Sequence, residues 1–431
     1  MIIFYRILFP FLLLAGLPYY GLRMIKRGGY SRDWHHRFGQ IGPLPAKRAG
    51  VKRVWVQAVS VGEIRALQPI MEDLIARSDI EVVLTTTTST GYLLVQEHYT
   101  EKCLKTGIFP LDWAPFCAQT WDRIEPDISL LMEGDLWPEH LHQAKKRNVP
   151  ALLINGRMSN RSFGRYQKIS RLSHWLFGKI SHVYAASNRD AQRFAELGIP
   201  KDRLLTTGNV KFDVRVEPIL GSAERQNLRR EMGFDDASLV IMGSSTWPGE
   251  EAFLLKVLAD AKKQNLDARL ILTPRHAERR KEIRKELEKH PVEFAFRTKQ
   301  PRSDRPLDVY VGDTTGELAM LTQAADVVFV GKSLPPHNEG QTPIEAAALG
   351  MPIVYGPGMA NFHQVCQSLE SAHAAWRALD EADARKKLIQ LLTDHQARNS
   401  LAQAAHSWHA QNRGAADRIL QSMTEHFLSP E

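Results

Sequence analysis

The chain has 431 residues, of which 43% are hydrophobic and 24% are charged, and its formal net charge at pH 7 is +8. These proportions exclude wholesale disorder, and the length favours two domains over one. The charge favours anionic partners such as phosphorylated substrates or acidic lipid surfaces; without a polybasic tail or an aromatic-interleaved basic stripe, nucleic acid is not expected. Three widely spaced cysteines indicate ordinary buried thiols.

An apolar segment opens the chain. Ile2 to Leu22 is interrupted by Arg6, and a basic stretch from Arg23 to Arg37 follows it. We expect residues 1–28 to form a membrane anchor, spanning or half-inserted, with its basic flank on the cytoplasmic side. A buried helix of the first domain is the alternative, since the clean apolar run from Ile7 to Leu22 falls short of the roughly 20 residues that span a bilayer.

The first half of the chain alternates apolar runs with helical segments. We expect helices at residues 63–77 and 114–124, and strands at residues 54–60, 80–86, 127–132, 151–154, 183–187 and 204–209. This alternation predicts a parallel sheet, whose ligands bind at the carboxyl ends of the strands. The first Rossmann-like domain is expected to cover residues 29–212.

A polar, strandless stretch at residues 214–231 separates this half from a second one. The pattern restarts with strands at residues 239–246, 268–272, 309–313 and 327–330, and it ends with helices at 382–392 and 402–427. We expect a second domain over residues 213–405 and a C-terminal helix, residues 406–431, that can cross back to the first domain. The predicted fold class is α/β of the GT-B type: two doubly wound domains that face a cleft.

The stretch from Val327 to Pro357 reads as strand, loop, helix and strand. Thr342 and Pro343 supply an N-cap hydroxyl and a first-turn proline, and Gly350 ends the helix. A helix N-terminus at the carboxyl edge of a parallel sheet binds anions, phosphate in particular. An ordinary crossover without a ligand is an equally open alternative.

Acidic residues follow two of the predicted strands in the first half. Glu63 lies in the first turn of a helix, where the helix dipole favours the ionised form of a general base. The commoner role of such a glutamate is to complement the dipole and nothing more. Glu133 and Asp135 end another strand, where a carboxylate can orient an acceptor or stabilise developing charge. No acidic or histidine cluster of matching spacing accompanies them, so no metal is expected.

Cations follow other strands. Arg157, Lys211, Arg275 and His276 lie at strand ends, where they suit a phosphate or a carboxylate. Solvation at the surface is the alternative for each one. Backbone N–H groups at residues 313–317 offer a further anion contact, and Glu345 is placed to accept hydrogen bonds from a ribose.

Several short motifs in a fixed order carry a family resemblance. They are Val59–Glu63, Met132–Pro138, Asn155–Ser162, Gly208–Asp213, Pro274–Arg279, Val311–Leu318 and Gly356-Pro357 with Asn361-Phe362. With the apolar N-terminus in front of them, the sequence resembles the 3-deoxy-D-manno-octulosonic acid (Kdo) transferases, membrane-associated enzymes that add Kdo to lipid A precursor.

The resemblance implies an inverting, metal-independent glycosyltransferase without a cofactor. It would move Kdo from CMP-Kdo to lipid A precursor (lipid IVA) in lipopolysaccharide core biosynthesis, at the cytoplasmic face of the inner membrane. Glu63 matches the family's proton acceptor, and Glu133 and Lys211 match its transition-state stabilisers. The CMP contacts and the supporting residues carry over to Pro274, Arg275, Thr315, Gly316, Glu317, Thr342, Pro343, Ile344 and Glu345, and to Arg157, His276 and Asp135.

The chain departs from the family pattern in its second half. Relatives have Gly-Gly-His-Asn-Pro-Leu-Glu where residues 339–345 read Glu-Gly-Gln-Thr-Pro-Ile-Glu, Lys332 replaces a glycine, and Trp247-Pro248 replaces His-Glu. The sequence therefore supports the reaction class better than the details of donor recognition. Another GT-B glycosyltransferase, a nucleotide-sugar epimerase and an inactive membrane-bound paralogue are the alternatives.

Overall fold

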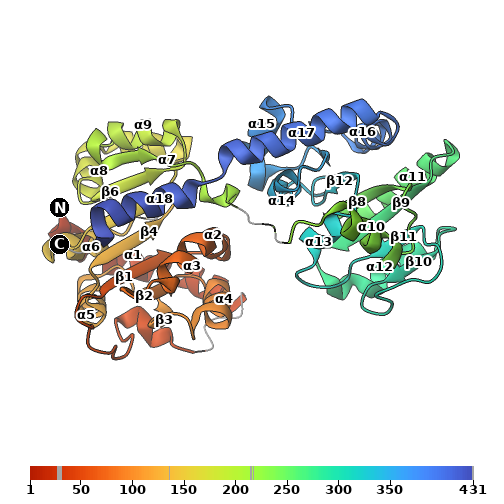
Figure 1. Ribbon diagram of the computed structural model, residues 1–431. Coiled ribbons are helices and arrows are strands. Elements are labelled where there is room, and N and C mark those ends of the chain that lie inside the picture. The colour runs from red at the N-terminus through yellow and green to blue at the C-terminus, as the bar shows by residue number, and fades with distance from the viewer. Residues whose placement is uncertain (27–31, 135, 214–215, 217, 430–431) are drawn as a thin grey trace. The chain divides into compact units, whose positions relative to one another are not determined.

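The chain folds into two compact α/β units (Figure 1). The computed structural model describes residues 1–26, 32–134, 136–213, 216 and 218–429, and the side chains of all of these except residues 17–26. Unit 1 comprises Met1–Asp213 and Arg413–Glu431, and unit 2 comprises Val214–Asn412. From the sequence, we predicted an anchor over residues 1–28, domains over residues 29–212 and 213–405, and a C-terminal helix over residues 406–431.

Unit 1 is built on a seven-stranded parallel sheet in the order β3-β2-β1-β4-β5-β6-β7. Val54 of β1 pairs with Val82 of β2 on one side and with Ile128 of β4 on the other. The direction in which strands are added reverses between β1 and β4, which makes this the topological switch point of the sheet. The strands are β1 (Lys52–Ala58), β2 (Ile80–Thr86), β3 (Lys105–Ile108), β4 (Ile128–Met132), β5 (Ala151–Gly156), β6 (His182–Ala185) and β7 (Leu204–Thr206).

Helices connect these strands. The helix expected over residues 63–77 is two helices, because Pro69 has no N–H to continue the ladder. A 3-10 turn, η3 (Val210–Phe212), follows β7. The α-helices of this part are α2 (Val61–Ala66), α3 (Gln68–Ala76), α4 (Ser89–Tyr99), α5 (Ala114–Ile124), α6 (Pro138–Lys146), α7 (Asn160–Lys168), α8 (Ser170–Phe177) and α9 (Asn188–Glu196).

Unit 2 repeats the design with the strand order β10-β11-β9-β8-β12-β13-β14, so its switch point lies between β8 and β12. The sequence pattern did not predict β10 or β14, which are too short to show a period. The strands are β8 (Leu239–Thr246), β9 (Ala268–Pro274), β10 (Phe294–Phe296), β11 (Val309–Val311), β12 (Val327–Val330), β13 (Ile353–Tyr355) and β14 (Trp376–Arg377). The helices are α10 (Ser222–Glu231), α11 (Glu250–Lys263), α12 (Arg280–Leu287), α13 (Leu318–Thr322), α14 (Ile344–Ala348), α15 (His363–Ser371), α16 (Glu381–Thr393) and α17 (His395–Asn412).

The C-terminal helix α18 (Ala415–Met423) belongs to unit 1 (Figure 1). Ile419 and Met423 are fully buried in the core that β1 and β2 also line. The continuous helix expected over residues 402–427 is wrong, because Gly414 adopts a left-handed φ of 88° between α17 and α18. Asp213 then caps α18, accepting hydrogen bonds from Ala415 N–H at 3.3 Å and Ala416 N–H at 2.6 Å.

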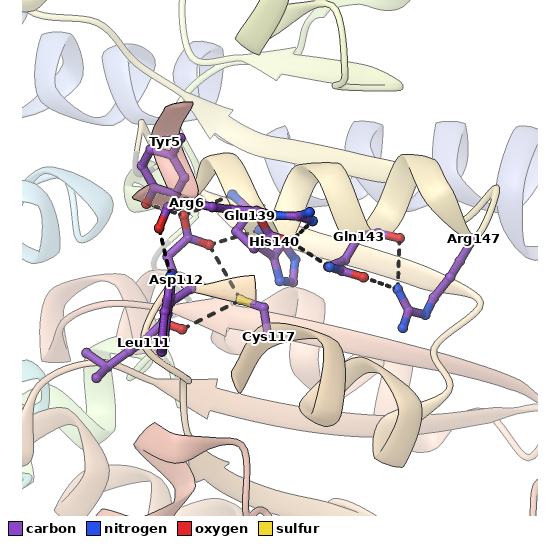
Figure 2. Close-up of polar contacts among 10 residues, drawn as sticks. Tyr5, Arg6, Leu111, Asp112, Cys117, Glu139, His140, Gln143 and Arg147 are labelled. Carbon is purple, nitrogen blue, oxygen red and sulfur yellow. Dashed lines mark hydrogen bonds and ion pairs between the residues drawn. The ribbon is translucent and has the colours of Figure 1, made fainter. Parts of the chain in front are cut away.

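The apolar N-terminal segment forms α1 (Ile2–Lys26), which contacts α6 through polar side chains (Figure 2). The Tyr5 hydroxyl donates to Asp112 at 2.7 Å, and the Arg6 guanidinium binds the buried carboxylate of Glu139 through two hydrogen bonds of 2.8 and 2.9 Å. Asp112 also accepts the N–H groups of Glu139 and His140, and burial raises the pKa of its carboxyl to about 6. The first turns of α1 are therefore tied to unit 1.

The spanning form of the expected membrane anchor is wrong, whereas the half-inserted form stays a prediction. No helix in the part of the chain that the structure describes is both long and apolar enough to cross a membrane. The run from Ile7 to Leu22 is shorter than a bilayer-spanning helix, as noted above. The outer side of α1 nevertheless exposes large apolar side chains, namely Ile3, Phe4, Ile7, Leu8, Phe11, Leu12 and Leu14.

The cap at the start of α18 predicts a stability effect. Asp213→Ala should lower the free energy of unfolding by about 1 kcal/mol, because the first N–H groups of α18 lose their acceptor. Urea unfolding measures this loss, and limited proteolysis should cut α18 sooner in the variant. Asp202→Ala, which removes an exposed carboxylate of the same unit, is the control. Equal behaviour of both variants would contradict the cap's role.

Candidate active site

Glu63 lies in the first turn of α2, directly after β1. Its side chain is 7% exposed, and its carboxylate accepts hydrogen bonds from Val59 N–H at 2.7 Å and from the Ser60 hydroxyl at 3.0 Å. Ser60 is the N-cap: its hydroxyl oxygen accepts the N–H of Glu63, while the Glu63 carboxylate accepts the N–H of the preceding residue, Val59. Glu63 thus has the structural role at the helix N-terminus that was the alternative from the sequence. Its role as a base stays a prediction.

Glu133, Lys211 and Arg157 meet at the carboxyl edge of the same sheet. Lys211 Nζ lies 2.5 Å from Glu133 Oε1, and Arg157 Nη1 lies 3.8 Å from the same oxygen. Glu133 adopts a left-handed φ of 59° just after β4, and its side chain is a quarter exposed. These three residues come from loops that are 20 to 80 positions apart in the sequence, and the structure brings them together as one group, the Glu133 triad.

The topology relates Glu63 to this triad. Glu63 follows β1 and Glu133 follows β4, and these two strands pair side by side at the switch point. Open parallel sheets bind their ligands in the crevice outside the strand ends at this point. Two carboxylates and two cations therefore lie at the edge where unit 1 is expected to bind a substrate.

Asn155 is a residue that the sequence reasoning named only as part of a motif. It is the residue before the last of β5 and has a left-handed φ of 51°. It is fully buried, and its Oδ1 accepts the N–H of Val210 at 3.2 Å. Val210 opens η3, the turn that carries Lys211. Asn155 therefore positions the lysine of the Glu133 triad. Its left-handed φ and full burial were not readable from the sequence.

Asp135 was also predicted as a site residue, and it lies outside the described residues. Another set, Asp33, His35 and His36, is close enough to hold a metal ion. However, His36 Nδ1 accepts the N–H of Ile108 and Asp33 accepts the hydroxyl of Tyr92, so two of its members have structural partners already.

The predicted donor residues all lie in unit 2, after neighbouring strands. Pro274 ends β9, and Arg275 and His276 follow it with exposed side chains. Thr315 and Gly316 are exposed after β11.

Glu317 is engaged with Arg297. The guanidinium donates two hydrogen bonds of 2.7 Å to the carboxylate, and these hydrogen bonds lower the pKa of Glu317. A ribose or base contact through this carboxylate would have to share it with Arg297.

The helix at Thr342 differs from the expectation in its start. α14 begins at Ile344, Pro343 takes the N-cap position, and the helix is five residues long. The Thr342 hydroxyl still accepts the N–H of Ile344 at 3.3 Å, and Gly350 follows the helix with a left-handed φ of 63°. Boundaries shift by a residue or two where a short helix frays, which accounts for the difference.

Comparisons with known proteins decide the family. A family model described as 3-Deoxy-D-manno-octulosonic-acid transferase (kdotransferase) matches residues 32–214. The 3-deoxy-D-manno-octulosonic acid transferase of Haemophilus influenzae is 30% identical over 409 residues, 94% of this chain and 93% of that protein. The chain belongs to the Kdo transferase family. It is therefore a glycosyltransferase by family. The Bordetella pertussis protein of the same name is 30% identical over 398 residues, 90% of each chain.

A solved structure supports the fold alone. The UDP-GlcNAc 2-epimerase of Neisseria meningitidis, bound to UDP-GlcNAc, has a TM-score of 0.56 with 14% identity, over 87% of this chain and all of that one. This member of the Kdo transferase family thus has two units, each with a parallel sheet and its own switch point.

The contact from Asn155 to the turn of Lys211 predicts an effect on turnover. Asn155→Ala and Asn155→Gly should both lower kcat about five- to tenfold with little change in KM, since each loses one hydrogen bond worth about 1 kcal/mol. Steady-state transferase assays measure this. Glycine tolerates the left-handed φ, so a loss in the alanine variant alone would mean that backbone strain, not the hydrogen bond, is responsible.

Proposed function

We propose that this protein transfers Kdo from CMP-Kdo to lipid A precursor (lipid IVA) in lipopolysaccharide core biosynthesis, by an inverting, metal-independent reaction. The observation that carries the proposal is the placement of Glu63 and Glu133 after the two strands that flank the switch point of unit 1. Family membership supplies the reaction class, and this placement supplies the chemistry at a substrate-binding edge.

In the proposed reaction Glu63 is the general base. Its carboxylate takes the proton of the acceptor's glucosamine hydroxyl, the hydroxyl oxygen attacks the anomeric carbon of Kdo, and the bond from that carbon to the phosphate oxygen breaks. CMP leaves as a phosphate anion, so the leaving group needs no acid. The N–H of Val59 and the hydroxyl of Ser60 orient the Glu63 carboxylate before the acceptor binds.

The Glu133 triad stabilises charge in this reaction. Bond breaking at the anomeric carbon leaves positive charge on the sugar and negative charge on the phosphate. Glu133 offers a carboxylate to the first, and Lys211 and Arg157 offer cations to the second. Because the ion pair is already formed, little reorganisation accompanies the reaction.

Unit 2 binds the donor in this proposal, and unit 1 binds the acceptor. Pro274 and Arg275, Thr315 to Glu317 and Thr342 to Glu345 would contact CMP. An epimerase acting on a UDP-sugar is the weaker candidate, since the likeness to such enzymes extends to the fold alone. An inactive paralogue is also weaker, because Glu63, Glu133 and Lys211 are all present.

We also propose that α1 lies half-inserted at the cytoplasmic face of the inner membrane. Its first turns are fixed to the rest of unit 1 through Tyr5 and Arg6 (Figure 2). Its other side exposes a row of large apolar side chains. A helix with an exposed apolar face can bury that face in the boundary between lipid headgroups and acyl chains. The net charge of +8 adds attraction to anionic lipid.

The role of Glu63 is tested by a pair of variants that separates the base from the cap. Glutamine keeps an acceptor for Val59 N–H and a donor for Ser60, so Glu63→Gln preserves the hydrogen bonds at the start of α2 but removes the base. We expect kcat to fall by about three orders of magnitude while CMP affinity persists. Ser60→Ala should instead cost about 1 kcal/mol of stability and leave most of the turnover. Unchanged turnover in Glu63→Gln would remove Glu63 from its role.

The orientation of α1 predicts a defect in membrane binding. Ile7 and Phe11 are 62% and 66% exposed, so Ile7→Asp with Phe11→Asp should lower binding to vesicles of anionic phospholipid at least about tenfold. Co-sedimentation measures the bound fraction. Leu93→Asp, at a residue of α4 that is 61% exposed, is the matched control and should bind as the unaltered protein does. Equal binding by all three proteins would refute the interfacial orientation.

A further inference from the structure

A second group of side chains gathers at the carboxyl edge of the sheet in unit 2. Trp247 follows β8, and Lys332 Nζ lies 4.1 Å from the centre of its ring. The rings of His276 and His337 lie 5.2 Å and 5.7 Å from that ring. These residues, here called the Trp247 cluster, come from the loops after β8, β9 and β12, which are neighbours in the sheet.

The backbone N–H groups beside the cluster already bind a carboxylate of the chain. Glu250 is buried and accepts the N–H groups of Trp247, Lys332 and Ser333 at 2.9, 2.7 and 2.9 Å. A Cβ at Gly331 would meet the carbonyl oxygen of Ser245 at 2.5 Å, so the two loops pack with no space between them. An anionic ligand of unit 2 therefore cannot bind these N–H groups. Side chains of the Trp247 cluster would have to bind its charge instead.

Lys332 is the cation that this turn presents. Its backbone has a left-handed φ of 58°, a conformation that favours glycine, so a lysine is held there against its backbone preference. Such outliers gather at ligand sites. The ammonium group lies 3.4 Å from a carboxylate oxygen of Glu339, a residue with a 43% exposed side chain, so its present ion partner is one that an incoming anion can replace.

Trp247 supplies an unused donor beside this cation. Its Nε1 is buried and has no hydrogen-bond acceptor among the described residues. An indole N–H can only donate, and buried donors without an acceptor are rare in folded proteins. An oxygen of a bound anion would satisfy it.

Backbone hydrogen bonds join the cluster to two of the predicted donor segments. The N–H of Gln341, next to Thr342, donates to Gly331 O at 3.1 Å, and the N–H of Arg275 donates to Thr246 O at 3.1 Å. Trp247 thus follows a residue that is hydrogen-bonded to the predicted CMP contact Arg275, and Lys332 follows a residue that is hydrogen-bonded to the neighbour of Thr342. They are also positions at which this chain departs from the family pattern.

We propose that Lys332 and Trp247 bind the phosphate of a nucleoside monophosphate in unit 2. The ammonium of Lys332 leaves Glu339 and pairs with the phosphate oxygens, and the indole N–H of Trp247 donates to one of them. The assignment deepens the proposed function and rests on it in one respect, namely that the donor of unit 2 is a nucleotide.

The test compares CMP with cytidine, which lacks the phosphate, by isothermal titration calorimetry on the full-length protein. Lys332→Gln should weaken CMP binding about tenfold and leave cytidine binding unchanged, because a charged hydrogen bond to phosphate is lost. Glu339→Gln, which removes the competing carboxylate, should tighten CMP binding. Lys263→Gln, at a largely exposed lysine of α11, is the control and should change neither affinity. Thermal unfolding confirms that each variant is folded.

The outcomes separate this site from the proposed donor. Equal weakening of CMP and cytidine, or no weakening of CMP, overturns the assignment of Lys332. Unchanged CMP affinity with a raised KM for CMP-Kdo also overturns it, since the lysine would then meet the sugar carboxylate. If the unaltered protein binds another nucleoside monophosphate instead of CMP, the proposed donor is wrong, and the same comparison with that nucleotide decides the site. Binding of no nucleoside monophosphate refutes both.

Discussion

Parallel pairing of β1 with both β2 and β4 is the constraint on which the candidate site depends. Because all strands of the sheet run the same way, every loop that leaves a carboxyl end emerges at one edge, and the reversal of strand order opens a crevice there. Glu63, Glu133, Arg157 and Lys211 all follow carboxyl ends of this sheet. Their convergence is a consequence of topology rather than of sequence proximity.

The two sheets share this design but use their switch points differently. In unit 1 the loop after β4 and the turn after β7 form a partly exposed ion pair between Glu133 and Lys211 at the edge. In unit 2 the corresponding position is filled by the buried carboxylate of Glu250, whose hydrogen bonds join the loops after β8 and β12. At this edge unit 1 therefore has partly exposed charged groups. In unit 2 the loop N–H groups are bound by Glu250, and the cationic and aromatic side chains of Lys332 and Trp247 lie beside them. This division fits an enzyme in which one half performs the chemistry and the other holds the donor.

The sequence predicted the long buried strands well and the short or interrupted elements poorly. Residues 80–86, 114–124 and 239–246 match β2, α5 and β8, because their apolar patterns are long and bounded. The pattern could not show β14, which has two residues, or the break at Gly414, since helical periodicity continues on both sides of it. Residues at strand ends were identifiable as candidates from the sequence. The contact of Glu133 with Lys211 and the burial of Glu250 were not, because both depend on residues that are far apart in the sequence. The side of α1 that packs on the rest of unit 1 was not predictable either, because it depends on Asp112 and Glu139, more than 100 residues away.

The central claim is that these two units transfer Kdo from its cytidine nucleotide to a lipid. The most direct measurement incubates the unaltered protein with CMP-Kdo radiolabelled in the sugar and with tetraacyl lipid A precursor, and then separates lipid from water-soluble products. The account predicts that label enters the lipid as CMP is released, and that UDP-sugars do not replace the donor. Label that remains in CMP-Kdo or appears only as free Kdo, or lipid that accepts a sugar from a UDP donor instead, would contradict it.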